Sequence, residues 1–332
     1  MANVELESTA REVVSRTILA ADESSGTIAK RFVKINVTST PETNRTYRQL
    51  LFTAPGVENN VSGVILFDET IRQSDSSGTP FPRFLADKGI VPGIKVDQGT
   101  VDMPTGEKLT QGLDGLNARL SEYKALGARF AKWRAVITIG EGIPTDDCIG
   151  QNAKALTQYA KACQKVGIVP IVEPEVIMDG AHSFERDLEV TRNTLTTVFE
   201  ELRNAGVDLT GMILKPNMVT SGTENPDQAD VQKVAQTTLD LLAKVVPAEV
   251  PGIAFLSGGQ SPDLATEHLN AINKIRNANP QKYPWRITAS YGRALQGETL
   301  EAWGGKDENV ANAQQVFISR AEKVFKASNG EL

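Results

Sequence analysis

Three lysines stand at the ends of short apolar segments, in GIKVDQG (Lys95), FAKWR (Lys132) and MILKPN (Lys215). Lysine is rarely buried without a partner, so a lysine in this setting either forms a structural ion pair or carries out chemistry. Lys215 is the strongest candidate for chemistry, because three apolar residues precede it and a proline follows. Desolvation and neighbouring ammonium groups lower the pKa of a lysine and make a free amine available. Such an amine attacks a ketone or aldehyde to form an imine, which accepts electrons when an adjacent carbon–carbon bond breaks.

Carboxylates occupy comparable positions in other segments. Glu173 and Glu175 are two residues apart in IVPIVEPE, so their side chains lie on one face of an extended strand. Two close carboxylates beside lysines can have their pKa values pushed apart, so that one donates a proton while the other stays ionised. Asp22 and Asp68 end two further segments. The alternative is structural: one glutamate only neutralises Lys132, and Lys215 is only a partner of Glu173.

Two small turns have the composition of a phosphate site: Ser257-Gly258-Gly259 and Ser290-Tyr291-Gly292-Arg293. Glycine-rich turns expose backbone N–H groups, and an arginine adds a planar cation that suits phosphate. A second and weaker anion site is indicated by Ser24, Thr27 and Arg31 in ESSGTIAKR. The alternative for the SSGT sequence is that it only caps the following helix.

These residues require elements that bring them together. Eight apolar segments are each followed by a turn and a helical pattern, at residues 18–24, 64–69, 93–99, 129–134, 168–175, 212–217, 252–259 and 286–293. Alternating strands and helices imply a parallel sheet covered on both faces. Eight such units favour an α/β fold, the closed (β/α)8 TIM barrel, over a doubly wound open sheet. In a barrel the carboxyl ends of all strands surround one site, and phosphate is held most often after strands seven and eight.

Local signals mark the ends of several helices. Asn225-Pro226 and Ser261-Pro262 are each expected to be an N-cap followed by proline at the first helical position. Glycines that follow helical patterns are expected to end those helices: Gly127, Gly167 and Gly206.

The domain organisation is expected to be simple. Helical patterns near residues 4–15 and 307–327 flank the repeated units. No linker or change of composition divides the chain, so residues 1–332 are predicted to form a single (β/α)8 barrel domain with flanking N- and C-terminal helices.

The composition excludes several classes of protein. The 332 residues are 40% hydrophobic and 23% charged, which is typical of a soluble globular protein. A net charge of −6 argues against nucleic acid or an anionic membrane surface as the main partner. No apolar run approaches the roughly 18 residues of a membrane span. The acidic N-terminal sequence MANVELESTA lacks the pattern of a signal peptide.

Cysteine and histidine are scarce. Cys148 and Cys163 exclude a disulfide framework and favour a reducing, cytoplasmic location, although a mature chloroplast-stroma protein would look the same. His182 and His268 are expected at the surface. Because these four residues have no paired spacing, no metal site is predicted, and we expect chemistry without a cofactor.

At this point the chain resembles the class I fructose-1,6-bisphosphate aldolases. The similar motifs run in order along essentially the whole sequence: ILAADESSGTIAKRF (18–32), GVILFDET (63–70), GIKVDQG (93–99), TQGLDGL (110–116), FAKWR (130–134), GIVPIVEPE (167–175), LKPNMVT (214–220), FLSGGQS (255–261) and SYGRALQ (290–296). The resemblance implies a metal-independent lyase of glycolysis, gluconeogenesis or the Calvin cycle. It also implies sugar bisphosphate and triose phosphate substrates and a homotetrameric assembly.

The resemblance implies a role for each matched residue. Lys215 matches the Schiff-base lysine, Glu173 the general acid/base, and Lys132 the lysine that assists carbinolamine formation and dehydration. Glu175 belongs to the hydrogen-bond network of Glu173, while Asp22 orients the base and the lysines and acts on the C4 hydroxyl. The C1-phosphate pocket is matched by Ser257, Gly258, Gly259, Ser290, Gly292 and Arg293. The C6-phosphate side is matched by Ser24, Thr27, Arg31 and Lys95, with Arg45 as a further substrate contact.

The implied reaction begins with attack of Lys215 on the C2 ketone of fructose 1,6-bisphosphate. Cleavage between C3 and C4 releases glyceraldehyde 3-phosphate, and the remaining enamine gives dihydroxyacetone phosphate. A related aldolase acting on sedoheptulose 1,7-bisphosphate is the alternative, because both substrates share the ketone end and both phosphates. A scaffold protein on an inherited barrel would be expected to lack a catalytic group, yet the four central ones are present: Asp22, Lys132, Glu173 and Lys215.

One part of the sequence departs from the family pattern. Animal and plant members carry a terminal tyrosine that helps exchange the proton on dihydroxyacetone phosphate, whereas this sequence ends in ASNGEL. We expect another group to deliver that proton, or the step to be slower. The residues after Ala327 are expected to form a frayed end that contributes little.

Overall fold

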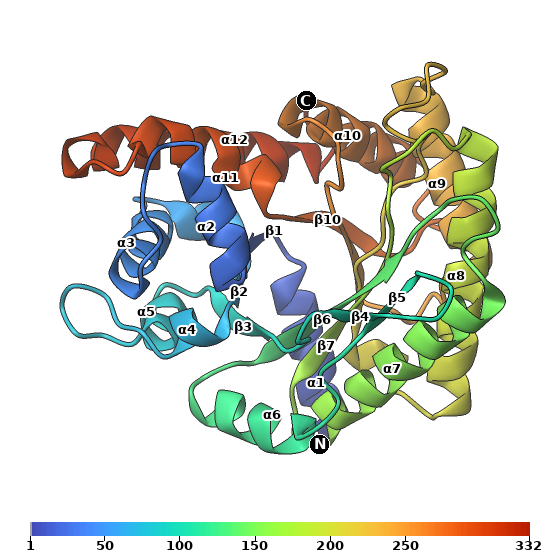
Figure 1. The fold of residues 1–332 in the computed structure, drawn as a ribbon, viewed down its shortest axis with the longest axis horizontal. Helices are drawn as coiled ribbons and strands as arrows, with labels where there is room; N and C mark the ends of the chain where they lie inside the picture. Colours follow the sequence, from blue (N-terminus) through green and yellow to red (C-terminus); the bar gives the residue numbers. More distant parts are fainter. Residues whose placement is uncertain (1) are drawn as a thin grey trace.

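A computed structural model describes residues 2–332, in which eight parallel strands close into a barrel (Figure 1). The strands are β1 (Thr17–Ala21), β2 (Val61–Leu66), β3 (Val91–Lys95), β6 (Phe130–Ile137), β7 (Val169–Val176), β8 (Ile213–Leu214), β9 (Gly252–Phe255) and β10 (Arg286–Tyr291). Each lies within or overlaps one of the eight predicted apolar segments. Pairing of β1 with both β2 and β10 closes the sheet, so the barrel is confirmed and the open sheet is wrong.

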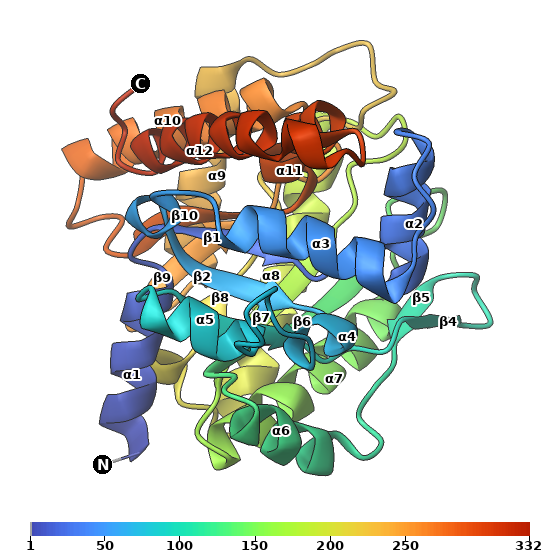
Figure 2. The ribbon, with the colours of Figure 1, turned by 90° about the vertical axis from the view of Figure 1, so that its left-hand side faces the viewer.

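The helices surround this barrel in the order expected for βα units (Figure 2). They are α2 (Ser25–Val33), α3 (Pro41–Phe52), α4 (Asp68–Ile71), α5 (Phe81–Asp87), α6 (Leu116–Ala125), α7 (Asp146–Lys165), α8 (Phe184–Asn204), α9 (Val231–Val245), α10 (Pro262–Ala278), α11 (Arg293–Trp303) and α12 (Val310–Ala327). A separate antiparallel hairpin, β4 (Thr100–Asp102) with β5 (Lys108–Thr110), follows β3. The apolar faces of the helices and the outward residues of the strands form the larger core.

The N-terminal helix α1 (Ala2–Val13) closes one end of the barrel. Buried Leu6, Ala10 and Val13 pack with residues of the barrel interior, among them Phe130. The interior is filled tightly: a Cβ added to Gly93 would lie 2.3 Å from the Phe130 ring. Because this end is sealed, the polar strand ends are left to form a site at the opposite, carboxyl end.

Most of the predicted helix boundaries are confirmed. The glycine stops have left-handed φ angles at the ends of α6, α7 and α8: Gly127 (+108°), Gly167 (+75°) and Gly206 (+69°). Ser261 caps α10 by accepting a hydrogen bond from Leu264 N–H, with Pro262 as the first helical residue.

The boundary predicted at Asn225-Pro226 is wrong. Helix α9 begins at Val231 and is capped by Asp230. The Asn225 side chain instead accepts a hydrogen bond from Asp227 N–H and donates to the carbonyls of Ala181 and His182. These hydrogen bonds of the Asn225 side chain therefore join the loop after β8 to the loop after β7.

The expected frayed end is also wrong, because the last residues pack on the molecule. Ser328 is fully buried. Arg286, the first residue of β10, donates hydrogen bonds to Ser328 O at 2.8 Å and to Asn329 Oδ1 at 3.0 Å. Asn270 of α10 donates to Leu332 O at 2.9 Å.

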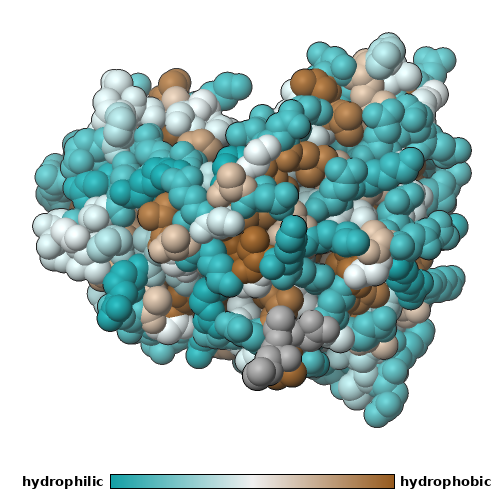
Figure 3. Space-filling model, turned by 90° about the horizontal axis from the view of Figure 1, so that it is seen from below, coloured by the Kyte–Doolittle hydropathy of each residue, from teal (hydrophilic) through white to brown (hydrophobic). Residues whose placement is uncertain are grey.

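The outer surface is largely hydrophilic on the side that Figure 3 shows, where hydrophobic residues form small groups between polar ones. Within residues 2–332, none of the helices combines the length and the apolar composition that crossing a membrane requires.

Candidate active site

A cavity of about 270 Å³ lies at the carboxyl ends of the barrel strands. It brings together most of the residues that the sequence singled out: Asp22, Ser24, Thr27, Arg31, Lys95, Lys132, Glu173, Glu175, Lys215, Ser257, Gly258, Ser290, Gly292 and Arg293. These residues come from all parts of the chain, as expected of a barrel site. Gly259 and Arg45 do not line it.

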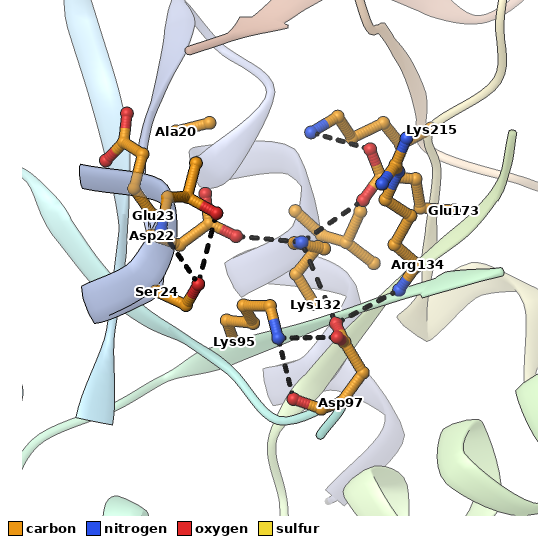
Figure 4. A network of polar contacts seen from close by, with 12 residues as sticks. Ala20, Asp22, Glu23, Ser24, Lys95, Asp97, Lys132, Arg134, Glu173 and Lys215 are labelled. Carbon is orange, nitrogen blue, oxygen red and sulfur yellow. Dashed lines mark hydrogen bonds and ion pairs between the residues drawn. The ribbon is translucent and has the colours of Figure 1, made fainter. Parts of the chain in front are cut away.

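The ammonium group of Lys132, on β6, lies at the centre of the polar network beside this cavity (Figure 4). Its Nζ is surrounded by three carboxylates, at 2.8 Å from Asp22 Oδ2, 3.4 Å from Glu173 Oε2 and 3.8 Å from Asp97 Oδ2. Only 5% of the Lys132 side chain is exposed. A cation in this position stays buried because its carboxylate partners are buried with it.

Lys215 lies beside Lys132 but has a different environment. It directly follows β8, and its backbone N–H donates to Val172 O on β7 at 2.8 Å. Its Nζ lies 3.0 Å from Glu173 Oε1, so Glu173 bridges the two lysines with its two oxygens. The Lys215 and Glu173 side chains are 5% and 4% exposed, so both are sheltered from bulk water.

The charges of Asp22 and Lys132 are fixed by each other. Burial would raise the pKa of Asp22, but attraction to Lys132 and Lys215 outweighs burial and holds the pKa well below its ordinary value. Burial would lower the pKa of Lys132, but the carboxylates of Asp22, Glu173 and Asp97 raise it well above the usual range. Lys132 is therefore a permanent ammonium at neutral pH and lacks the lone pair that a nucleophile needs.

Two residues of the site, Asp97 and Arg134, had no predicted role. Asp97 accepts a hydrogen bond from Lys95 and faces Lys132, while Arg134 is paired with Glu175. Burial would lower the pKa of Arg134, but Glu175 raises it above the usual range. Glu175 is thus neutralised by Arg134, and the glutamate that faces Lys132 is Glu173.

The turns that follow β9 and β10 form the first candidate anion site. Gly292 precedes α11 and makes no side-chain cap, so the first N–H groups of this helix lack a side-chain acceptor where Gly292 and Arg293 line the cavity. Arg293 joins the two turns, because its Nη2 donates to Gly258 O at 2.7 Å. Ser290 Oγ is buried and has no hydrogen-bond partner among residues 2–332. Gly259 instead points its N–H at Met178 Sδ, 2.9 Å away.

The second candidate anion site lies across the cavity at the start of α2. Ser24 caps this helix by accepting from Thr27 N–H, so the capping interpretation of SSGT holds, and both residues also line the cavity. Arg31 is paired with Glu23, a buried residue that the sequence did not single out. Glu23 in turn binds the buried Arg48 at 2.7 Å, which fixes the direction of Arg31.

Arg45, predicted as a substrate contact, and Asp68, singled out as a polar strand end, lie elsewhere. Arg45 on α3 pairs with Glu42 at 2.6 Å, which holds it away from the cavity. Asp68 begins α4 and pairs with Arg72 at 2.9 Å. It lines a separate cavity of about 930 Å³, which meets the first at Ser24, Lys95 and Arg134. The larger cavity lacks the buried lysine–glutamate pair, so its size does not make it the reaction site.

The surface placement expected for the histidines is wrong. Only 3% of His268 and 5% of the His182 side chain are exposed. Burial lowers the pKa of His268 to about 4, which keeps it neutral. Neither lines the cavity. In the part of the chain described, no three His, Cys, Asp or Glu side chains are grouped to hold a metal ion.

Comparison with known proteins agrees with this geometry. The family model for class-I fructose-bisphosphate aldolase matches residues 5–332. A probable class 1 fructose-bisphosphate aldolase of Xylella fastidiosa is 49% identical, with 98% of each chain covered. Cytosolic fructose-bisphosphate aldolase 4 of Arabidopsis thaliana is 49% identical over 94% of this chain and 79% of the relative.

A solved structure gives the same result. The Plasmodium falciparum fructose-bisphosphate aldolase, crystallised with TRAP and a small-molecule inhibitor, is 47% identical and superposes with a TM-score of 0.96, covering 99% of this chain and 95% of that one. With a family model that spans nearly the whole sequence and relatives of this similarity, the chain belongs to the class I fructose-bisphosphate aldolase family.

Proposed function

We propose that this aldolase, a lyase, cleaves fructose 1,6-bisphosphate through an imine at Lys215. The observation that carries the proposal is the pair of buried lysines that share Glu173, with Nζ–O distances of 3.0 Å for Lys215 and 3.4 Å for Lys132. Lys132 is held as an ammonium by three carboxylates. Lys215 contacts Glu173 alone among them, and transfer of its proton to that carboxylate makes it a nucleophile.

The proposed first stage forms the imine. The substrate lies between the two candidate anion sites, with its C1 phosphate at Arg293 and its C6 phosphate near Arg31 and Lys95. Lys215 Nζ attacks C2 and becomes positively charged, and one of its protons then passes to the ketone oxygen, which becomes a hydroxyl on a neutral carbinolamine. Glu173 then gives a proton to this hydroxyl, which departs as water, and the nitrogen lone pair forms the C=N bond. Lys132 stabilises the negative charge that develops on oxygen.

The proposed second stage breaks the carbon chain. Asp22, which is kept ionised by Lys132, accepts the proton of the C4 hydroxyl. The C4–O electrons form the aldehyde, the C3–C4 pair moves to C3, and the iminium nitrogen is neutralised as an enamine. Protonation at C3 and hydrolysis release dihydroxyacetone phosphate and return Lys215. The ion pairs of Asp22 with Lys132 and of Glu173 with Lys132 and Lys215 support these roles, because paired groups need little reorientation when substrate binds.

Borohydride reduction in the presence of dihydroxyacetone phosphate tests the proposal. We expect the mass of a reduced triose on the peptide that contains Lys215, and no such adduct in Lys215→Met or without substrate. EDTA should leave kcat unchanged, because the iminium supplies the positive charge that draws electrons from the bond. Adducts confined to Lys95 or Lys132, or loss of activity in EDTA, would overturn the mechanism.

Three further properties belong to the same proposal. The names of the relatives favour fructose bisphosphate over sedoheptulose bisphosphate, and the Arabidopsis and spinach relatives named cytosolic or cytoplasmic support a cytoplasmic location. A single folding domain is supported by the pairing of β1 with β10, which joins both ends of the chain. The homotetramer usual in the family is proposed as the assembly, and sedimentation equilibrium would test it.

A further inference from the structure

The backbone hydrogen bonding between β7 and β8 ends at Lys215. Strands β7 and β8 pair at only two positions, Ile171 with Ile213 and Val172 with Leu214, before Lys215 N–H donates to Val172 O. Pro216 follows, and proline has no N–H with which to continue the ladder. Strand β7, however, runs on through Glu173 to Val176. The nucleophile and its proton partner therefore lie where the regular backbone pairing between their strands stops.

The side chain of Asn217 spans this gap. Its Oδ1 accepts a hydrogen bond from Val176 N–H at 3.2 Å, so the amide takes the place of the missing ladder bond. Its Nδ2 donates to Thr191 Oγ1 at 3.0 Å and to Met218 O at 3.2 Å. Asn217 is 4% exposed and does not line the cavity, so it has no access to substrate.

A buried chain behind Asn217 fixes the direction of its amide. Thr191 on α8 donates its hydroxyl hydrogen to Asp187 Oδ1 at 3.2 Å, which leaves the oxygen of that hydroxyl to accept from Asn217. The amide therefore cannot flip without losing Thr191 as a partner. Asp187 is 1% exposed, and its other oxygen lies 3.6 Å from His182 Nε2.

We propose that Asn217 is a positioning residue for the aldolase reaction, held by Thr191 and Asp187, which sets Lys215 against Glu173. This proposal rests on the function proposed above. Asn217 lies two residues after Lys215, and it binds Val176, which lies three residues after Glu173. Loss of the Asn217 side chain therefore frees the nucleophile to move relative to its proton partner. The phosphate-binding groups belong to other loops and stay in place. The effect is therefore on the rate of imine formation and not on substrate binding.

Two sets of variants test the proposal. In Asn217→Ala we expect kcat to fall about 10- to 100-fold, the range for losing a group that orients a catalytic residue, while KM for fructose 1,6-bisphosphate stays within about twofold. Thr191→Val removes the hydroxyl and keeps the shape, and it should give a smaller fall in kcat of the same kind. Thr191→Ser keeps the hydroxyl, so its kcat should stay at the wild-type value. The rate of borohydride labelling at Lys215 should follow kcat in each variant.

The outcomes are separable. Three results would overturn the positioning role. The first is a wild-type kcat in Asn217→Ala, and the second is a change in that variant confined to KM. The third is equal activity in Thr191→Val and Thr191→Ser. If Asn217→Ala does not fold, the two Thr191 variants decide, with the folded fraction at the assay temperature measured by circular dichroism. Wild-type protein that fails to be labelled at Lys215 would instead contradict the proposed function.

Discussion

Two lysines of the same type have different surroundings, and the roles proposed for them differ accordingly. Lys132 has carboxylate oxygens at 2.8, 3.4 and 3.8 Å, and these raise its pKa even though burial opposes a charge. Lys215, nearby, contacts Glu173 at 3.0 Å. An ammonium that stays charged polarises oxygen, whereas an amine that can lose its proton attacks carbon. Residue identity alone does not distinguish the two proposed roles, whereas the number of carboxylate contacts differs between the two lysines.

Arg293→Ala tests the first anion site at the residue scale. Arg293 is exposed and bridges to Gly258 O, so it is available to a phosphate without losing its own support. Removing one charge-assisted contact should cost about 1.5 kcal/mol, which corresponds to roughly a tenfold rise in KM for fructose 1,6-bisphosphate. Inhibition by inorganic phosphate should weaken in parallel, and Arg293→Lys should lose less. An unchanged KM would make Arg293 a purely structural bridge.

At the scale of elements, the sequence predicted the strand ends well because each apolar segment is short and stops at a polar residue. It missed Asp97 and Arg134, although each is two residues after a predicted lysine, the same spacing that related Glu173 to Glu175. Applying the strand period to every segment would have found both. Glu23 could not be found in this way, because its role depends on Arg48, which comes from another helix.

The predictions for Asn225 and the two histidines were wrong for a different reason. Asn225 has the local features of a helix cap, but its amide is used to join two loops, and nothing within a few residues of it carries that information. The two histidines were expected at the surface because polar residues usually lie there, whereas His182 packs near Asp187 and His268 lies in the buried face of α10. Long-range partners decide such positions, and local pattern does not.

Gly93→Ala tests the packing between two strands. The new Cβ would lie 2.3 Å from the Phe130 ring inside the barrel, so we expect the free energy of unfolding to fall by about 1–3 kcal/mol or more. Gly150→Ala in α7 is the matched control, because open space surrounds that position and alanine should stabilise the helix by about 0.5–1 kcal/mol. Urea unfolding measures both.

A second substitution identifies the cause of the Gly93→Ala effect. Phe130→Leu makes room in the barrel interior, so adding it to Gly93→Ala should cost less than the sum of the two single changes. Additive losses, or a stable Gly93→Ala variant, would show that the interior accommodates the methyl group by other movements.

At the scale of the whole molecule, both ends of the chain hold the barrel on the side away from the candidate site. Helix α1 fills the amino end of the barrel, while β10 pairs with β1 and leads into the helices that return across it. The last residues bind Arg286 at the start of β10, whereas the reaction site lies beyond its other end at Ser290 and Arg293. The contacts that hold the chain ends and the site proposed for catalysis thus lie at opposite ends of the same strand, the usual division in this fold.

This separation predicts the effect of removing residues 328–332. A chain ending at Ala327 loses the acceptors that Ser328 and Asn329 offer to Arg286, at 2.8 and 3.0 Å. Burial lowers the pKa of Arg286, because its guanidinium is largely shielded from water. Leaving such donors unpaired costs about 1–3 kcal/mol, so we expect Tm to fall by a few degrees. Because none of the five residues lines the cavity, kcat at 25 °C should stay unchanged.

Calorimetry at a fixed scan rate measures the expected fall in Tm, and a steady-state assay measures kcat separately. Arg286→Met in the full chain should lower Tm by a similar amount, because it removes the same hydrogen bonds from the other side. A truncated chain with wild-type Tm would show that these contacts contribute nothing to stability. A truncated chain with wild-type Tm and reduced kcat would mean that residues 328–332 act in the reaction, and the division between the two ends of β10 would then be wrong.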